Sequence, residues 1–349
     1  MRPAEQRAQL DIEVGRAQIA CAGVEVAEGL AAVRALEPGR LALWGQAPAL
    51  DLQIELGQDA PLDWRLEVAN CMPGALLRVL GPDGSPVEAR LAGRPRAAAQ
   101  DWEIAFPAAG RYALSLAPPD ADEPEAFRFA VLSDIQRGVD RVAEIFERMN
   151  ADPEIRFVVS TGDLANFGTR GELERIQREL ERLEVPFFST VGNHELGEGE
   201  PADWHALFGR HSFRFRFHGV RFYLVDSASA GIDQLVYDRL AGWMAEAGTA
   251  PQVFVSHIPP LDPIGVRNGS FRSRKEAAKL LSRLSAGGVD LTLYGHIHSY
   301  YAFSNAGIPA HISGGGGAIP ERFDGIGRHY LVIEAAESGL GAVEVVRVD

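Results

Sequence analysis

The sequence has little cysteine or lysine and no long apolar run. Its two cysteines, Cys21 and Cys71, allow at most one disulfide and cannot form a thiolate metal site. No stretch approaches the roughly 18 consecutive apolar residues that a membrane-spanning helix needs. The 48 acidic residues outnumber the 34 basic ones, of which two are lysines, so we expect no broad basic surface for nucleic-acid duplexes.

A secretory signal is also missing from the first 23 residues, which contain no long apolar segment. We therefore expect a cytoplasmic protein, or a periplasmic or secreted one if a leader preceded this sequence. A chain of 349 residues is long enough for about two domains. The composition predicts no particular oligomeric state.

Histidine is absent before position 194, and the first part of the chain also differs in pattern. Short, partly alternating apolar segments between turn-rich pieces predict a small all-β, sandwich-like domain over residues 1–116. These segments are 50–56, 63–69, 75–80, 102–106 and 111–116. A helix is expected near Val26–Ala35, and the acidic, proline-rich residues 117–126 predict a linker. This domain carries no catalytic motif, which favours a packing or substrate-shaping role over a separate ligand-binding module.

From residue 127 onward, apolar runs alternate with amphipathic segments of helical spacing. Helices are expected at 139–149, 171–183, 234–247 and 274–284, with strands between them and mainly strands after residue 298. Such alternation predicts an α/β domain over residues 127–349 whose sheet is at least partly parallel.

Five of the apolar runs end in side chains that can bind a metal. In chain order these side chains are Asp134 and Gln136, Asp163, Asn193 and His194, His257, and His296 and His298. Sites in open α/β sheets lie outside the carboxyl ends of the strands, so we expect the five groups to converge. Mixed oxygen and imidazole ligands suit Mn²⁺, Fe or Zn²⁺. Eight such groups are too many for one ion but suffice for two that share a carboxylate, a common arrangement for phosphoester hydrolysis.

The order D-x-(H/Q), G-D, G-N-H-(D/E), H, G-H-x-H resembles that of the calcineurin-like metallophosphoesterase superfamily, over roughly Phe127–Ala335. The resemblance implies a sandwich of two mixed β-sheets flanked by helices, with two divalent metal ions. The first ion would be held by Asp134, Gln136 and His298, the second by Asn193, His257 and His296, and Asp163 would bridge them. His194 would assist the leaving group while metal-activated water attacks phosphorus.

The first motif departs from the commoner D-x-H, because Gln136 offers an amide oxygen where an imidazole is usual. In this it is similar to the subgroup that includes manganese-dependent ADP-ribose/CDP-alcohol diphosphatases. We therefore expect Mn²⁺, with Fe, Zn²⁺ or Mg²⁺ as alternatives. Asn166 and Phe167 stand where serine/threonine protein phosphatases have an aspartate and an arginine, and Asn166 stands where purple acid phosphatases have a ligating tyrosine. Neither subclass is supported.

Other residues have weaker context. Arg267, Arg272 and Arg274 follow His257 on or near a glycine-containing segment and are candidate substrate-binding residues, because arginine matches phosphate oxygens well. They are otherwise ordinary surface cations. Glu195 is either a group that orients an imidazole or a surface carboxylate at a turn. The glycine run 314–317 is expected to let the backbone pass close to the metal site. His205, His211, His218 and His329 lack a motif and are expected to be structural or exposed.

Two functions from different classes fit these observations. The first is a dinuclear metal-dependent phosphoesterase that hydrolyses small phosphomonoesters, phosphodiesters or nucleotide diphosphates. The second is a non-catalytic scaffold of the same fold that binds a partner protein. Because one ligand position departs from the family pattern, and does so with another oxygen donor, the completeness of the ligand set favours the enzyme.

Overall fold

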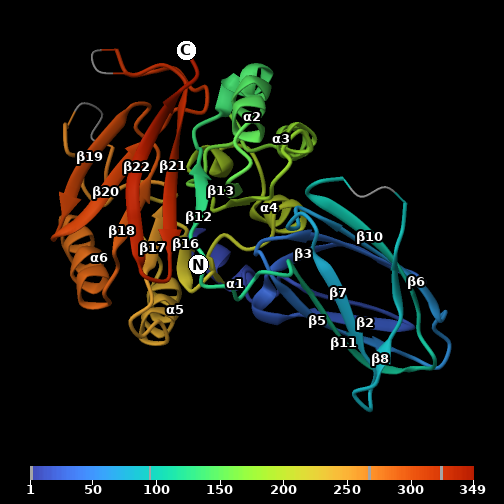
Figure 1. Cartoon of the computed structure of the whole chain (residues 1–349). Helices are drawn as coiled ribbons and strands as arrows, with labels where there is room; N and C mark the ends of the chain where they lie inside the picture. The colour runs from blue at the N-terminus through green and yellow to red at the C-terminus, as the bar shows by residue number, and fades with distance from the viewer. Residues whose placement is uncertain (1–2, 94–95, 266–268, 323–324) are drawn as a thin grey trace.

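The structure is a computed structural model that describes residues 3–93, 96–265, 269–322 and 325–349. Two β-sheets form the region before residue 118, and two further sheets covered by helices form the rest (Figure 1). Cys21 and Cys71 are both free thiols. Within the described ranges, no helix is long and apolar enough to cross a membrane.

Alternating burial explains the N-terminal sheets. In strand β5 (Leu50–Leu56) every second residue is buried, so the strand turns one apolar face to a core that Trp64 and Trp102 of the facing sheet share. The six-stranded sheet contains, in spatial order, β1 (Arg16–Ile19), β2 (Ala22–Val26), β5, β11 (Gly110–Ala117), β7 (Leu76–Leu80) and β8 (Pro86–Val87). The five-stranded sheet contains β3 (Ala31–Glu37), β4 (Arg40–Gly45), β6 (Asp63–Ala69), β10 (Ala99–Ala105) and β9 (Ala89–Leu91). The expected β-rich region before residue 127 is confirmed.

The helix expected near Val26–Ala35 is wrong. These residues form a short 3₁₀ turn, η1 (Ala27–Gly29), followed by strand β3. Alanine, leucine and glutamate favour a helix locally, but β3 pairs along its length with β4, from Ala31 opposite Gly45 to Glu37 opposite Arg40. Tertiary pairing outweighs intrinsic helix preferences, which differ by less than about 1 kcal/mol per residue among these residue types.

Beyond residue 127 two mixed sheets face each other. The first contains β14 (Phe187–Ser189), β13 (Ile155–Ser160), β12 (Phe127–Val131), β21 (His329–Ala336) and β22 (Gly339–Arg347). The second contains β15 (Phe213–Phe217), β16 (Val220–Val225), β17 (Gln252–Ser256), β18 (Leu291–Tyr294), β20 (Ile308–Ser313) and β19 (Tyr300–Asn305). Phenylalanines fill the space between them; the rings of Phe157 and Phe222, one from each sheet, lie 5.4 Å apart.

Helices cover the outer faces of this sandwich (Figure 1). The helices are α2 (Val142–Asn150), α3 (Arg170–Leu180), α4 (Pro201–Leu207), α5 (Gln234–Ala245) and α6 (Arg274–Ala286), with 3₁₀ turns η2 (Gln136–Arg141) and η3 (His194–Leu196). Apolar residues of α2 and α3 pack on the outward residues of β12 and β13, and those of α5 and α6 on the outward residues of β16 and β17. Alternate residues of these strands therefore face the opposite sheet on one side and the helices on the other. The expected fold of two mixed sheets flanked by helices is confirmed.

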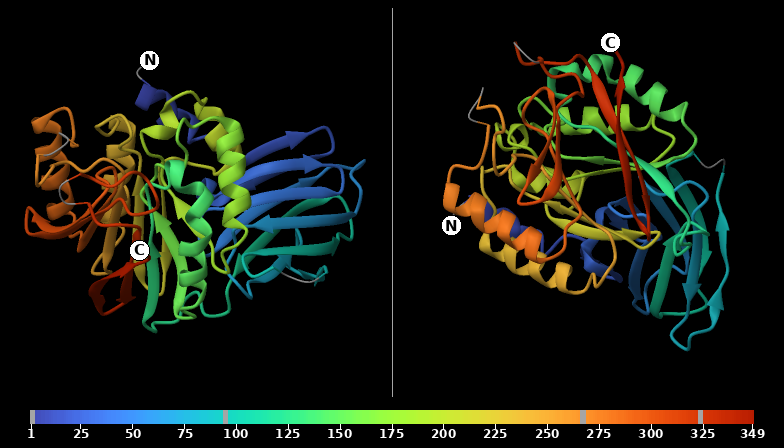
Figure 2. Two further views of the ribbon diagram at one scale, coloured as in Figure 1. Left: turned by 90° about the horizontal axis from the view of Figure 1, so that it is seen from above. Right: turned by 60° about the vertical axis from the view of Figure 1, so that its left-hand side comes forward.

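A further helix, α1 (Pro3–Leu10), begins the described chain and was not expected from the sequence. It packs against α4 and α5. In both views of Figure 2 this dark-blue helix lies against the part of the chain that follows residue 127. Arg7 of this helix is buried, and its Nε donates to Oδ2 of Asp226 at 2.7 Å. The N-terminal segment is therefore anchored to the region that follows residue 127.

Candidate metal centre

The eight side chains that follow strands in the sequence lie in one network of contacts. They are Asp134, Gln136, Asp163, Asn193, His194, His257, His296 and His298, from loops after β12, β13, β14, β17 and β18. Strands β12, β13 and β14 are parallel neighbours in one sheet, and β17 and β18 in the other, so the carboxyl ends of each set meet at one edge. The expected convergence therefore follows from strand direction.

Asp163 lies at the centre of this network and is buried. Its Oδ2 is 3.0 Å from Nε2 of Gln136 and 3.2 Å from Nε2 of His257. Its Oδ1 accepts a hydrogen bond from the backbone N–H of His194 at 2.8 Å. One carboxylate thus contacts residues from both of the expected metal positions.

The ring of His257 is fixed by contacts at both of its nitrogens. Its Nδ1 lies 3.1 Å from the carbonyl oxygen of Thr161, an acceptor, so this nitrogen carries the ring proton. Nε2 then turns its lone pair toward Oδ2 of Asp163, at 3.2 Å, and Oδ1 of Asn193, at 3.1 Å. Burial by itself lowers the pKa of His257, but the charges of Asp163 and Asp134 raise it to about 9. Acceptors gathered in a negative potential are suited to a cation.

His298 repeats this arrangement beside Asp134. Its Nδ1 lies 2.7 Å from the carbonyl oxygen of Ile319, and its Nε2 lies 3.5 Å from Oδ1 of Asp134. Burial by itself raises the pKa of Asp134, but the hydrogen bond with His298 and the positive charge of neighbouring histidines hold it below its usual range. A histidine whose other nitrogen donates to a carbonyl has the tautomer and orientation typical of metal ligands.

Gln136 and His296 complete the network. Nε2 of Gln136 lies 3.3 Å from Nε2 of His298, and rotation of the amide by half a turn would place Oε1 there instead. The backbone N–H of His296 donates to Oδ2 of Asp134 at 3.1 Å. Ligand atoms of Asp163, His257 and His296 lie within 4.8 Å of one another. Contacts therefore link all the residues expected to hold the metals into one network.

The backbone at this site is strained. Asp134, Gln136, Asp163 and His296 have positive φ angles, between 45° and 70°. Such conformations cost non-glycine residues of order 1–3 kcal/mol each and persist where the surrounding structure imposes them, often at functional sites. The glycine run that follows β20 contributes to this packing, since the N–H of Gly316 donates to the carbonyl of Ser133 at 2.8 Å.

Comparison with known proteins identifies the family of the domain that carries this site. Residues 127–300 match the family of calcineurin-like phosphoesterases. This chain contains a calcineurin-like phosphoesterase domain. A search of curated protein sequences finds no significant match.

Solved structures with the same fold extend this result. A purple acid phosphatase from yellow lupin (Lupinus luteus) seeds is similar with a TM-score of 0.57 and 13% identity, over 86% of this chain and 70% of that one. A dimetal phosphatase from Danio rerio is similar with a TM-score of 0.50 and 13% identity, over 64% of this chain and 99% of that one. The similarity to the lupin phosphatase covers 86% of this chain, which is more than the residues after 126 make up. It therefore extends into the N-terminal sheets.

Glu195 of the phosphoesterase domain does not orient an imidazole. It is buried, and its carboxylate accepts hydrogen bonds from the backbone N–H groups of Asp163, Ala165 and Gly192, at 2.7–2.9 Å. Burial and the charge of Asp163 raise the pKa of Glu195. The residue holds the loops after β13 and β14 together, which neither sequence interpretation of Glu195 included.

Two of the three arginines proposed for substrate lie in the described part of the chain. Arg272 and Arg274 are exposed, the first joined to Ala230 through its backbone and the second beginning α6. Arg267 lies outside the described residues. Arg137, which the sequence analysis did not consider, donates from Nε to Oδ1 of Asn166 at 3.2 Å. Asn166 also supplies the carbonyl oxygen that lies 2.6 Å from Nδ1 of His194, so Arg137 lies near His194.

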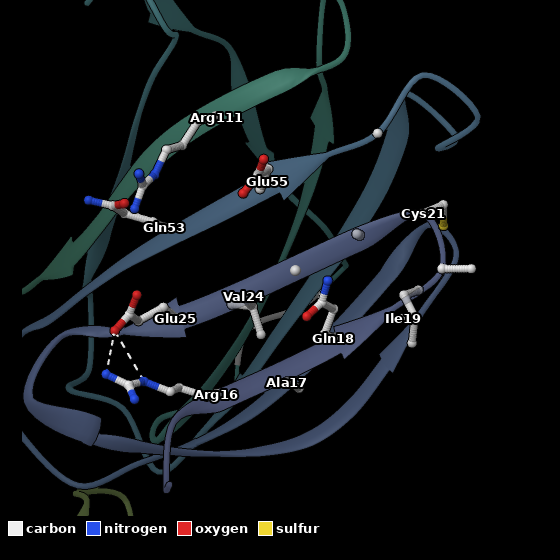
Figure 3. A pocket seen from close by; sticks show the side chains of 14 residues that line it. Arg16, Ala17, Gln18, Ile19, Cys21, Val24, Glu25, Gln53, Glu55 and Arg111 are labelled. Carbon is white, nitrogen blue, oxygen red and sulfur yellow. Dashed lines mark hydrogen bonds and ion pairs between the residues drawn. The ribbon is translucent and has the colours of Figure 1, made fainter. Parts of the chain in front are cut away.

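A shallow pocket of about 550 Å³ lies elsewhere, on the N-terminal six-stranded sheet (Figure 3). Its polar side chains come from β1, β2, β5 and β11, and Arg16 and Glu25 among them pair with each other at 2.8 Å. None of the predicted site residues lines it. Its charges are of both signs, which identifies no ligand class.

Proposed function

We propose that the chain is a dinuclear metal-dependent phosphoesterase. The observation that carries the proposal is the orientation of His257 and His298, whose Nδ1 atoms face carbonyl oxygens while Nε2 faces carboxylates. Imidazoles that face carboxylates through Nε2 need positive charge there, either a second ring proton or a bound cation, and a divalent ion between each Nε2 and its carboxylate supplies that charge. The donor set of carboxylate, amide and imidazole groups therefore fits two divalent ions.

Each ion has its own ligands in this proposal. Asp134, Gln136 and His298 would hold the first, Asn193, His257 and His296 would hold the second, and Asp163 would bind both. When bound, the ions would activate a water molecule and neutralise charge on the phosphoryl oxygens. The burial of Asp134, Asp163 and His257 keeps these ligands in fixed positions.

His194 assists the leaving group. Its Nδ1 lies 2.6 Å from the carbonyl of Asn166, so it carries one proton, and its Nε2 is 3.9 Å from Oδ2 of Asp163. A third of the side chain is exposed, which leaves this edge of the ring open to a substrate. A second proton on Nε2 makes the ring an acid that can protonate the departing oxygen.

The substrate class is a small phosphorylated compound: a phosphomonoester, a phosphodiester or a nucleotide diphosphate. The amide oxygen of Gln136 makes the first ion's ligand set harder than a histidine at this position would, which supports Mn²⁺. The preference for Mn²⁺ is inferred from the chemistry of the ligands.

Hydrolysis of p-nitrophenyl phosphate and bis-p-nitrophenyl phosphate, with and without Mn²⁺, tests the proposal. We expect Mn²⁺-dependent release of nitrophenol from at least one of them, lost in an Asp163→Ala variant. Folded protein that binds two metal equivalents but hydrolyses neither these esters nor a panel of nucleotide diphosphates would instead support the partner-binding scaffold.

A further inference from the structure

A second group of metal-ligand side chains lies outside the phosphoesterase centre. Asp11 follows α1, His205 lies on α4, and His211 lies just before β15. Nε2 of His205 is 2.9 Å and Nδ1 of His211 is 3.2 Å from Oδ1 of Asp11, and the three atoms lie within 4.8 Å of one another. Asp11 and His211 are buried, and the side chain of His205 is 10% exposed.

Both ring nitrogens of His205 face oxygen acceptors, although a neutral imidazole carries one N–H. Its Nδ1 lies 2.8 Å from the carbonyl oxygen of Pro201, which only accepts, so Nδ1 carries the proton of a neutral ring. Nε2 would then turn a lone pair toward a carboxylate oxygen 2.9 Å away. Two explanations remove this repulsion: a second ring proton or a cation bound by both atoms. This is the same arrangement that His257 and His298 show in the phosphoesterase centre.

The surroundings of Asp11 leave one oxygen for a cation. Its Oδ2 accepts from the backbone N–H of Ser212 at 3.0 Å and lies 3.9 Å from Nη1 of Arg239. Its Oδ1 faces both imidazoles and accepts from the backbone N–H of His211 at 2.8 Å. Burial by itself raises the pKa of Asp11, but hydrogen bonds with His205 and His211 hold it below its usual range, so the carboxylate is anionic.

His211 can offer one ring nitrogen, Nδ1, to a cation at this site. Burial lowers the pKa of His211, which favours the neutral ring. Its Nε2 is buried without a hydrogen-bond partner, so that nitrogen gains nothing from the protein in either tautomer. With the ring proton on Nδ1, that nitrogen donates to Oδ1 of Asp11 at 3.2 Å; a bound metal would require the other tautomer, with the proton on Nε2 and the lone pair of Nδ1 toward Oδ1.

We propose that Asp11, His205 and His211 form a third metal site, which binds Zn²⁺ or a similar borderline divalent cation. Zn²⁺ bound to nitrogen and oxygen at about 2.0 Å has ligands about 3.3 Å apart in a tetrahedron. The observed separations of 2.9 and 3.2 Å match two edges of such a site. Three protein ligands leave the fourth position for water.

The role of this site is structural. Asp11 is 194 and 200 residues from its two partners in the chain, so a shared cation would fasten the N-terminal segment to the phosphoesterase domain. The buried pair of Arg7 and Asp226 joins the same two parts. A cation that binds the folded chain but not the unfolded chain stabilises the folded state by mass action.

The test compares Zn²⁺ binding by the full chain and by a His205→Gln/His211→Asn variant. Glutamine places an amide nitrogen near the position of Nε2, and asparagine near that of Nδ1. The variant therefore keeps donors toward Asp11 but loses both imidazole ligands. The matched control is His218→Gln, because His218 is buried with Nδ1 2.8 Å from the carbonyl of Glu125 and Nε2 3.6 Å from one carboxylate, that of Asp120.

Equilibrium dialysis against Zn²⁺, with metal measured by mass spectrometry, should show about one equivalent less for the double variant than for the parent and the control. Zn²⁺ should also raise the melting temperature of the parent more than that of the variant. Equal metal content in folded parent and variant would overturn the proposal and assign a second proton to His205. If the double variant does not fold, the single His205→Gln variant, altered at the more exposed position, is judged by the same two measurements. Because the readout is a difference of one equivalent, failure of the proposed phosphoesterase activity would not affect it.

Discussion

Asn70 and Phe187 exchange two hydrogen bonds between the N-terminal sheets and the phosphoesterase domain. The side-chain oxygen of Asn70 accepts from the N–H of Phe187 at 2.7 Å, and its Nδ2 donates to the carbonyl of Phe187 at 2.9 Å. The same Nδ2 donates to the carbonyl of Gly45 at 2.8 Å. Phe187 begins β14, the strand that leads to Asn193, so this contact fixes the strand behind one metal ligand.

We predict that Asn70→Ala lowers the free energy of unfolding by more than about 2 kcal/mol, because it leaves buried backbone groups of two strands without partners. Asn70 also has a φ of 58°, which alanine adopts less readily. Urea unfolding measures the effect. Asn150→Ala is the control, since Asn150 makes similar bonds to Arg182 and Glu184 in a more exposed setting where water can replace them. Equal losses in the two variants would contradict the prediction.

Asp163→Ala should abolish activity more completely than the loss of any other ligand. Its carboxylate contacts residues assigned to both ions, so its removal should release metal and slow turnover by more than ~10³-fold, which corresponds to ~4 kcal/mol of transition-state stabilisation. Metal analysis and ester hydrolysis provide the measurement. Asp140→Ala, at an exposed aspartate, is the control. Near-parental turnover with two bound metals in Asp163→Ala would refute the bridging role.

His194→Ala should keep its metals but turn over more slowly, by roughly 10²–10⁴-fold, as expected for a positioned acid. His194→Asn can still donate to the carbonyl of Asn166 but cannot transfer a proton, so it should be no better than alanine. Turnover and metal content are measured on the same preparations. Loss of one metal equivalent would show instead that His194 is a ligand.

Gln136→His should tighten the first metal position and shift activation from Mn²⁺ toward Zn²⁺ or Fe, because imidazole is a softer donor than an amide oxygen. Activity can fall while affinity rises, since a tighter site holds the nucleophile in another geometry. Metal titrations of activity for both forms test this. Identical affinities and the same metal ranking would mean that Gln136 does not bind the first ion.

The sequence by itself determined the order of the metal-ligand residues and their places at strand ends. These are local features, because an apolar run that ends at Asp134 or Gly162 is recognised from neighbouring residues in the chain. Parallel strands then bring the ends of such runs to one edge of the sheet. The helices α2, α3, α5 and α6 were likewise predicted, because segments such as α3 and α6 carry caps and apolar spacing of their own. The short helix α4 was not predicted.

Only the tertiary structure decided which distant residues meet. Residues 31–37 became a strand because β4 pairs with them, and Glu195 found three backbone donors rather than an imidazole. His205 and His211 looked unremarkable in the sequence because their partner, Asp11, is about 200 residues away. Contacts across such separations leave no local pattern, since they are set by how the sheets and helices pack and not by the residues beside them in the chain.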